Sequence, residues 1–180
     1  MNEIKQEALE ELKRVKSNYQ QFIRDNFEFA AADCRTCPTP GHCCIDAHFV
    51  NVHITRLEAV AIKEMLAQKL TAIELKTVYE RVQAAIEKYN LKSEGETFAQ
   101  TFACPLFEPN VGCLIHAEGA KPAPCIQHAC YEQKEDLPPQ CLQDYAHDRI
   151  EKLNREVYGE NWQWLPLPLQ LIKVTFGDEK

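Results

Sequence analysis

The chain has 180 residues, of which 45% are hydrophobic and 26% are charged, and its formal net charge is -7. The hydrophobic fraction supports a core of ordinary size, whereas the acidic balance argues against nucleic acid as a main partner, because phosphate binding needs a basic face. No apolar run reaches the ~18 residues that a membrane-spanning helix needs, and the charged start of the sequence is unlike a signal peptide. We therefore expect a single cytoplasmic domain over residues 1–180 with no membrane contact.

The cysteine content is the most informative feature of the composition. The chain has nine cysteines. In the reducing cytoplasm a cysteine cluster more often binds metal or carries out redox chemistry than forms disulfides, and an odd count fits a disulfide framework poorly. The composition therefore favours a metal site.

Residues 3–29 predict one long helix that begins the chain. Its apolar residues recur every three to four positions, and lysines and glutamates fill the opposite face. The apolar face consists of Ile4, Ala8, Leu12, Val15, Tyr19, Phe22 or Ile23, and Phe27. We expect this face to meet the core or a second copy of the chain.

The first cysteine-rich segment follows this helix and reads D-C-R-T-C-P-T-P-G-H-C-C-I-D over residues 33–46. It contains Cys34, Cys37, Cys43 and Cys44. A C-x2-C pair can place both sulfurs on one small cation, whereas adjacent cysteines diverge, so Cys43 and Cys44 could serve different sites. Its prolines and glycine disfavour regular structure, so we expect a bound metal to order the segment.

Two capping boxes define the middle of the chain. Thr55 with Glu58 and Thr71 with Glu74 each predict a helix start. The helices they begin, to about Lys69 and Tyr89, are joined by a short connection and should form a helical hairpin. Alternating polar and apolar residues before the first box predict a short strand over 48–54.

The second cysteine-rich segment covers residues 102–130 and is interrupted by prolines and glycines. It contains Cys104, Cys113, Cys125 and Cys130. Residues 111–116 within it predict a short strand beside the earlier one.

The last part of the chain predicts a final helix and an apolar tail. The helix opens at residues 136–139, where proline is tolerated in a first turn, and Cys141 in it is interpreted as a small buried apolar side chain. The tail contains Trp162 and Trp164 and should pack over the domain or a partner subunit.

These elements together predict a mainly α fold. Its helical scaffold consists of the long N-terminal helix, the central helical hairpin and the C-terminal helix, and it carries two irregular cysteine-rich metal-binding loops and at most a small β-hairpin. The expected parts are the N-terminal helix (1–30), the cysteine-cluster metal-binding core (31–135) and the C-terminal helix and tail (136–180).

Eight thiolates can hold metal in more than one way. Each group of four could close its own tetrahedral site, or the two groups could interleave. Zinc is the first choice; iron or an iron–sulfur cluster is the alternative, although the C-x2-C-x5-C-C spacing matches neither common ferredoxin spacing. His42, His116 and His128 could replace a sulfur, but we expect them to be solvated or hydrogen-bonded.

The cysteine motifs resemble those of a known family. After the first motif come the helix start at Thr55 and Glu58 and then C-P-L-F (104–107), G-C-L-I-H (112–116) and K-P-A-P-C (121–125). In combination they resemble the bacterial CxxCxxCC, or YkgJ-like, cysteine-cluster family of zinc- or iron-chelating proteins. Here five residues instead of two precede the cysteine pair, and His116, Lys121 and Ile126 stand where Tyr, Arg and Arg are usual. The resemblance implies metal binding by the eight cysteines.

The sequence therefore predicts a cytoplasmic protein that holds zinc, or iron, through two groups of four cysteines. No catalytic motif is present, with neither a G-x-S-x-G nor a phosphate-binding loop. An iron or iron–sulfur redox enzyme or metalloenzyme using the same thiolates is the first alternative. A metal-stabilised interaction module, which would dimerise or dock a protein partner through the N-terminal helix or the Trp-bearing tail, is the second.

Overall fold

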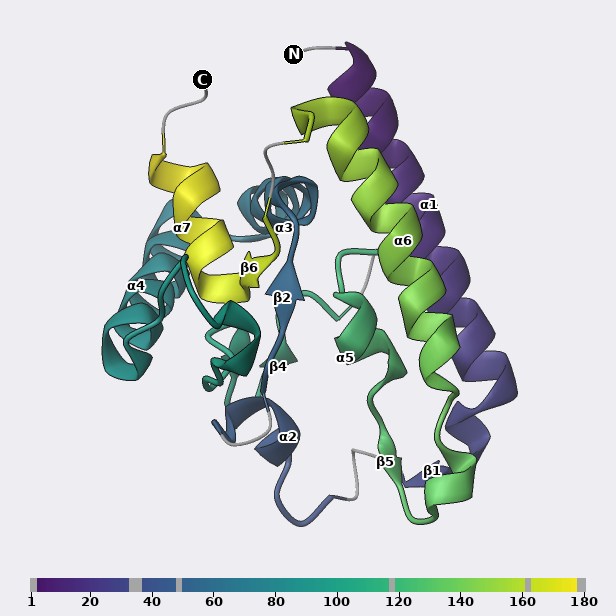
Figure 1. Cartoon of the computed structure of the whole chain (residues 1–180). Coiled ribbons are helices and arrows are strands. Elements are labelled where there is room, and N and C mark those ends of the chain that lie inside the picture. Colours follow the sequence, from purple (N-terminus) through teal and green to yellow (C-terminus); the bar gives the residue numbers. More distant parts are fainter. Residues whose placement is uncertain (1–2, 33–36, 48–49, 117–118, 161–162, 178–180) are drawn as a thin grey trace. The chain divides into compact units, whose positions relative to one another are not determined.

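A computed structural model of the chain describes residues 3–32, 37–47, 50–116, 119–160 and 163–177 (Figure 1). These residues are mainly helical, with short antiparallel strand pairs, which confirms the predicted mainly α class. The α-helices are α1 (Glu3–Asn26), α2 (His42–Ile45), α3 (Arg56–Lys69), α4 (Ala72–Tyr89), α5 (Ala123–Gln127), α6 (Gln140–Tyr158) and α7 (Leu167–Phe176). The strands are β1 (Ala31–Ala32), β2 (His53–Ile54), β3 (Phe107–Glu108), β4 (Gly112–Cys113), β5 (Cys130–Tyr131) and β6 (Leu165–Pro166).

The chain divides into two units, each built from two separate stretches of sequence. The first unit comprises residues 1–40 and 117–160, and the second comprises residues 41–116 and 161–180. The expected cysteine core, residues 31–135, is therefore divided between the two units. The single-domain expectation itself stays a prediction.

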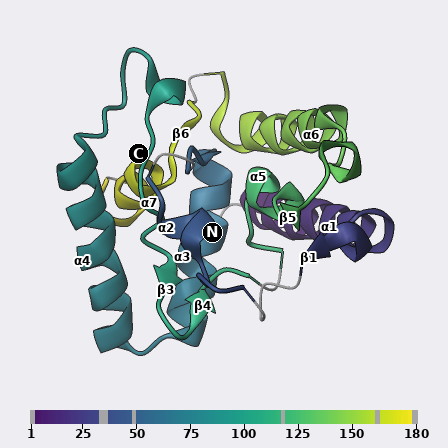
Figure 2. The same ribbon diagram turned by 90° about the horizontal axis from the view of Figure 1, so that it is seen from below.

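In the first unit, α6 and α5 pack on α1, and β1 pairs with β5 (Figures 1 and 2). The helix predicted over residues 3–29 is α1, followed by one 3-10 turn at Glu28–Ala30. Its predicted apolar face is correct in part, because Ala8, Leu12 and Ile23 are buried, whereas Ile4 is 53% exposed. Of the two alternatives Phe22 and Ile23, the buried residue is Ile23. The buried face of α1 therefore overlaps the predicted face but is rotated slightly about the helix axis.

Lys16 is a buried residue of α1 that the prediction placed on the opposite face. Its side chain is only 1% exposed, and its Nζ donates a hydrogen bond to the carbonyl oxygen of Ala120 at 3.3 Å. The aliphatic part of a lysine can pack against apolar neighbours while its ammonium reaches a polar partner. The assignment of the lysines to the outer face was therefore wrong at this position.

In the second unit, α7 packs against α3 and α4 (Figures 1 and 2). Lys63 on α3 donates a hydrogen bond to the Val174 carbonyl oxygen of α7 at 2.9 Å, and β2 pairs with β6 just before α7 begins. The apolar tail thus packs within its own chain, as one of the two expected outcomes. It also forms a helix, so the expectation that the helix after residue 136 is the last one was wrong.

The two central helices begin where the sequence predicted. In both capping boxes the threonine hydroxyl accepts a hydrogen bond from the glutamate backbone N–H at 3.3 Å. The glutamate carboxylate in turn accepts from the threonine backbone N–H, at 2.9 Å for Glu58 and 2.8 Å for Glu74. The first box is buried and the second is exposed.

The strand pairing was not predicted correctly. β4 pairs with β3 to form a small hairpin, and β2 pairs with β6, so β4 does not pair with the earlier strand as predicted. Within the predicted 48–54 strand, only His53 and Ile54 form a strand, and residues 48 and 49 lie outside the described residues. The helix expected to open at 136–139 begins at Gln140. Across the described ranges, no helix is long and apolar enough to cross a membrane.

We expect the buried capping box to contribute more to stability than the exposed one. Thr55→Ala removes the cap of α3 together with a hydrogen bond to the buried Glu58 carboxylate, whereas Thr71→Ala makes the same change at an exposed site. A lost cap costs about 0.5–2 kcal/mol, and we expect Thr55→Ala to lie at the upper end of that range and Thr71→Ala at the lower. Urea unfolding of both variants measures the difference, and equal losses would contradict it.

Candidate metal centre

The second unit brings together parts of both cysteine-rich segments. The backbone N–H of Cys104 donates a hydrogen bond to the carbonyl oxygen of Cys44 at 2.7 Å. A second bond runs from the Phe102 N–H to the Val50 carbonyl oxygen at 3.0 Å. Two segments far apart in the sequence therefore lie side by side, with α2, which carries Cys43 and Cys44, at one end.

The β3–β4 hairpin adds Cys113 to this region. Phe107 and Cys113 are register partners in the hairpin, and the Phe107 N–H donates to the Cys104 carbonyl oxygen at 3.3 Å. The Leu114 N–H closes the base of the hairpin on the Leu106 carbonyl oxygen at 3.0 Å. The hairpin thus brings the second cysteine of its segment back toward the first.

Gly41 lets α2 approach the hairpin closely. This residue precedes α2 with φ 79°, in the left-handed region that favours glycine. A Cβ atom built there would lie 1.8 Å from the Phe107 ring. The Phe107 ring therefore occupies the space that any other side chain at position 41 would need.

Two opposing influences act on the Cys104 thiol. Burial raises the pKa of Cys104 to about 11, and the neighbouring Cys113 adds to the rise. The backbone N–H groups of Leu106 and Phe107 and the positive charge of Arg81 act in the opposite direction, because they favour the thiolate. Cys104 is thus a neutral thiol at neutral pH without metal, surrounded by groups that would stabilise its anion.

Arg81 is a functional candidate that the sequence analysis missed. It lies on α4, away from every cysteine in the sequence, and its Nη1 forms an ion pair with Glu108 of the hairpin at 3.4 Å. Its Nε and Nη2 are buried, and in the part of the chain that the structure describes they have no hydrogen-bond partner. Buried N–H groups without an acceptor are costly, so this guanidinium fits a region that can carry negative charge.

The other predicted ligands belong to the first unit. Cys125 lies on α5, and Cys130 lies opposite Ala32 in the β1–β5 pair. Cys37 is also described, partly buried, whereas Cys34 lies outside the described residues. The seven predicted ligands that the structure describes are therefore distributed over both units.

The cysteines suit a metal by donor type. Among the residues that the structure describes, no three His, Cys, Asp or Glu side chains are grouped so that they could hold a metal ion. Cysteine, however, has a single side-chain torsion, so a change of rotamer redirects each sulfur without moving the backbone. Thiolates are the donors that zinc, iron and iron–sulfur clusters share.

The histidines and Cys141 differ in their surroundings. His42 forms an ion pair through Nε2 with Asp46 at 3.2 Å, within its own short helix. His116 and His128 are exposed. Cys141 is exposed on α6, so its interpretation as a buried apolar side chain was wrong.

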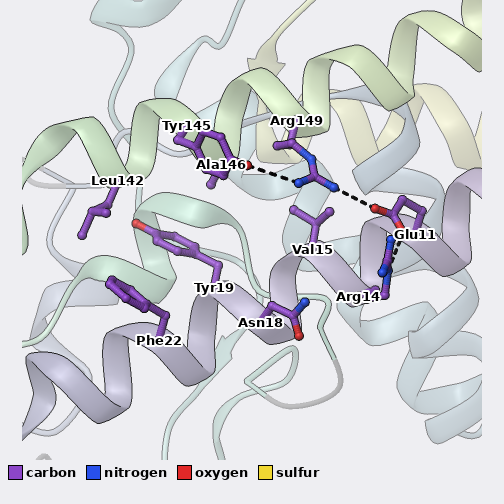
Figure 3. Close-up of a pocket in the computed structure, with 10 residues that line it drawn as sticks. All are labelled: Glu11, Arg14, Val15, Asn18, Tyr19, Phe22, Leu142, Tyr145, Ala146 and Arg149. Carbon is purple, nitrogen blue, oxygen red and sulfur yellow. Dashed lines mark hydrogen bonds and ion pairs between the residues drawn. The ribbon is translucent and has the colours of Figure 1, made fainter.

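A groove of about 430 Å³ lies between α1 and α6 in the first unit (Figure 3). Arg149 on α6 forms an ion pair across the groove with Glu11 on α1, with 2.9 Å between Nη2 and Oε1. Its Nη1 also donates a hydrogen bond to the Tyr145 hydroxyl. Burial raises the pKa of Tyr19, which donates to Gln127, to about 12. None of the described cysteines lines this groove. The expected partner of α1 stays a prediction.

Comparisons with protein families, with curated proteins and with solved structures find no match for this chain. The resemblance to the cysteine-cluster family therefore stays a prediction.

The close approach at Gly41 yields a test with a matched control. Gly41→Ala and Gly95→Ala both place alanine at a positive φ, 79° and 77°, which costs about 1–2 kcal/mol. Only Gly41 has the Phe107 ring in the way, since nothing lies within 4 Å of a Cβ at Gly95. Overpacking should add about 1–3 kcal/mol at Gly41 alone. Chemical unfolding measures the free energy of unfolding of both variants. Equal destabilisation would show that the contact between α2 and the hairpin does not contribute to stability.

The raised pKa of Cys104 predicts its reactivity in metal-free protein. At pH 8 iodoacetamide should modify exposed Cys141 well before Cys104, and Cys104 should react readily only as the pH approaches 11. Because the folded pKa lies above the ordinary value of 9.0, the neutral thiol stabilises the fold below pH 9. That contribution is lost as the pH rises to about 11. Mass spectrometry of timed samples follows each cysteine; equal rates at pH 8 would contradict the expectation.

Proposed function

We propose that this protein binds thiophilic metal ions through its cysteines, with zinc as the first choice and iron or an iron–sulfur cluster as the alternative. The proposal assigns it to the cytoplasm, where thiols stay reduced and able to bind metal. The proposed ligands are Cys34, Cys37, Cys43, Cys44, Cys104, Cys113, Cys125 and Cys130. Eight thiolates suffice for two four-coordinate ions.

One observation carries the proposal. The hydrogen bond from the Cys104 N–H to the Cys44 carbonyl oxygen joins the two cysteine-rich segments at their cysteines. The β3–β4 hairpin returns Cys113 toward Cys104. Among the described residues, the buried Nε and Nη2 of Arg81 have no hydrogen-bond acceptor. Three stretches of backbone therefore bring Cys44, Cys104 and Cys113 into one region, and a thiolate metal site needs its cysteines close together.

A bound ion would supply folding free energy to segments with little regular structure. Zinc binding to a structural thiolate site is worth about 10 kcal/mol or more at neutral pH. The chain's own residues contribute the backbone placement of the cysteines and the partial burial of Cys104. No reaction is assigned to the site.

Metal analysis of protein purified without oxygen tests this proposal. We expect about two zinc ions per chain, because eight thiolates complete two tetrahedral sites, and we expect chelation to lower the melting temperature markedly. A coloured protein with charge-transfer absorption would instead assign iron or a cluster.

Cys141→Ser provides the control for this measurement. Its thiol is exposed on α6, so the variant should retain the full metal content and melting temperature. Protein that contains less than one metal ion per chain, with all its thiols open to titration, would refute metal binding.

A further inference from the structure

We propose that Cys43, Cys44, Cys104 and Cys113 form one metal site inside the second unit, with the Arg81 guanidinium donating hydrogen bonds to its sulfurs. The inference rests on the proposed function. It goes further by stating which cysteines share an ion and which positive charge serves them. The remaining metal ligands are then those of the first unit.

This grouping differs from the one that sequence order suggests. By position along the chain, Cys44 belongs with Cys34 and Cys37, and Cys104 belongs with Cys125 and Cys130. The boundary of the two units crosses both segments, after Pro40 and after His116. Each unit therefore receives half of each segment, and the two groups are interleaved.

Three independent contacts hold the four cysteines of the second unit in one region. The Cys104–Cys44 backbone bond joins the segments, the β3–β4 register returns Cys113 toward Cys104, and the Phe107 ring against Gly41 holds α2 on the hairpin. None of these three contacts is made by a cysteine sulfur, so the backbone and the Phe107 ring keep the four cysteines within a small region.

The charge of such a site explains the state of Arg81. Four thiolates around a divalent ion leave a net charge of about minus two, and Glu108 adds a further negative charge to the same hairpin. Arg81 Nη1 pairs with Glu108, while Nε and Nη2 stay buried without an acceptor in the described ranges. Thiolate sulfurs bound to metal are the acceptors that these two N–H groups lack.

Arginine suits this role better than lysine. Its planar guanidinium can bind a carboxylate through one nitrogen while it donates from the others in a fixed fork, whereas a lysine ammonium acts as a compact point charge. Groups that donate to metal ligands typically change metal affinity by about 10–100-fold when removed. Arg81 is thus a positioning residue that acts on the metal through the sulfurs.

Paired serine substitutions in the full chain distinguish the two groupings. If the four cysteines of the second unit share one ion, Cys44→Ser with Cys104→Ser should remove one zinc per chain, and Cys104→Ser with Cys125→Ser should remove two. Grouping by sequence order gives the opposite result, because Cys44 and Cys104 then serve different ions. Zinc is counted after equilibration with a competing chelator, so that weakened sites are empty.

Arg81 variants test the second half of the proposal. Arg81→Met should weaken zinc binding by about 10–100-fold, and Arg81→Lys should recover part of the loss. Lys76→Met removes the same charge from an exposed position on the same helix and should bind zinc as the unaltered chain does. In the cobalt-loaded protein, Arg81→Met should also move the sulfur-to-cobalt charge-transfer band to lower energy, since sulfurs without hydrogen bonds give up electrons more easily.

The possible outcomes separate this inference from the proposed function. A chain that binds no metal refutes both. A chain that binds two ions but gives the reversed serine pattern refutes only the grouping. An Arg81→Met variant with unchanged affinity and an unchanged cobalt spectrum refutes the role of Arg81, because a purely structural residue would not shift the absorption band and then be rescued by lysine.

Discussion

The backbone contact between the two cysteine-rich segments is the constraint on which the arrangement in the second unit depends. Neither segment forms long regular structure, so its buried backbone groups must find partners elsewhere. The bonds from Cys104 to Cys44 and from Phe102 to Val50 supply them, and the side chains of Phe102 and Val50 are buried beside them. The long loop that these bonds close costs entropy, but α3 and α4 fill that loop with structure of their own.

Local signals in the sequence predicted the long helices α1, α3, α4 and α6, but not α7. The strand pairing that the sequence missed depends on long-range contacts. Both capping boxes depend on residues three apart, so α3 and α4 begin where expected. The pairing of β2 with β6 joins residues from opposite ends of the second unit, and no short pattern encodes it. The buried lysine of α1 is likewise paired with a carbonyl from another segment.

The candidate site shows the same division between local and distant information. The sequence identified the cysteines, because their spacing and their turn-rich surroundings are local features. It could not say which of them lie together, since that depends on the Cys104–Cys44 contact and on the hairpin. The sequence could not single out Arg81, because arginines are common on amphipathic helices. Only the structure shows that two of its N–H groups are buried. Cys141 was misjudged for a related reason: which side of α6 is covered depends on its neighbours.

The adjacent pair, Cys43 and Cys44, places the sharpest requirement on the metal. Consecutive residues of a helix point about 100° apart around its axis, and α2 is a single turn that begins just before both of them. A lone zinc ion needs each sulfur at about 2.3 Å, so both side chains must turn toward the hairpin. A cluster with several metal atoms would accept the diverging sulfurs at separate irons. Arg81 offsets the negative charge of either centre and so does not choose between them. The choice of metal therefore depends on how far the α2 turn can bring its two sulfurs together.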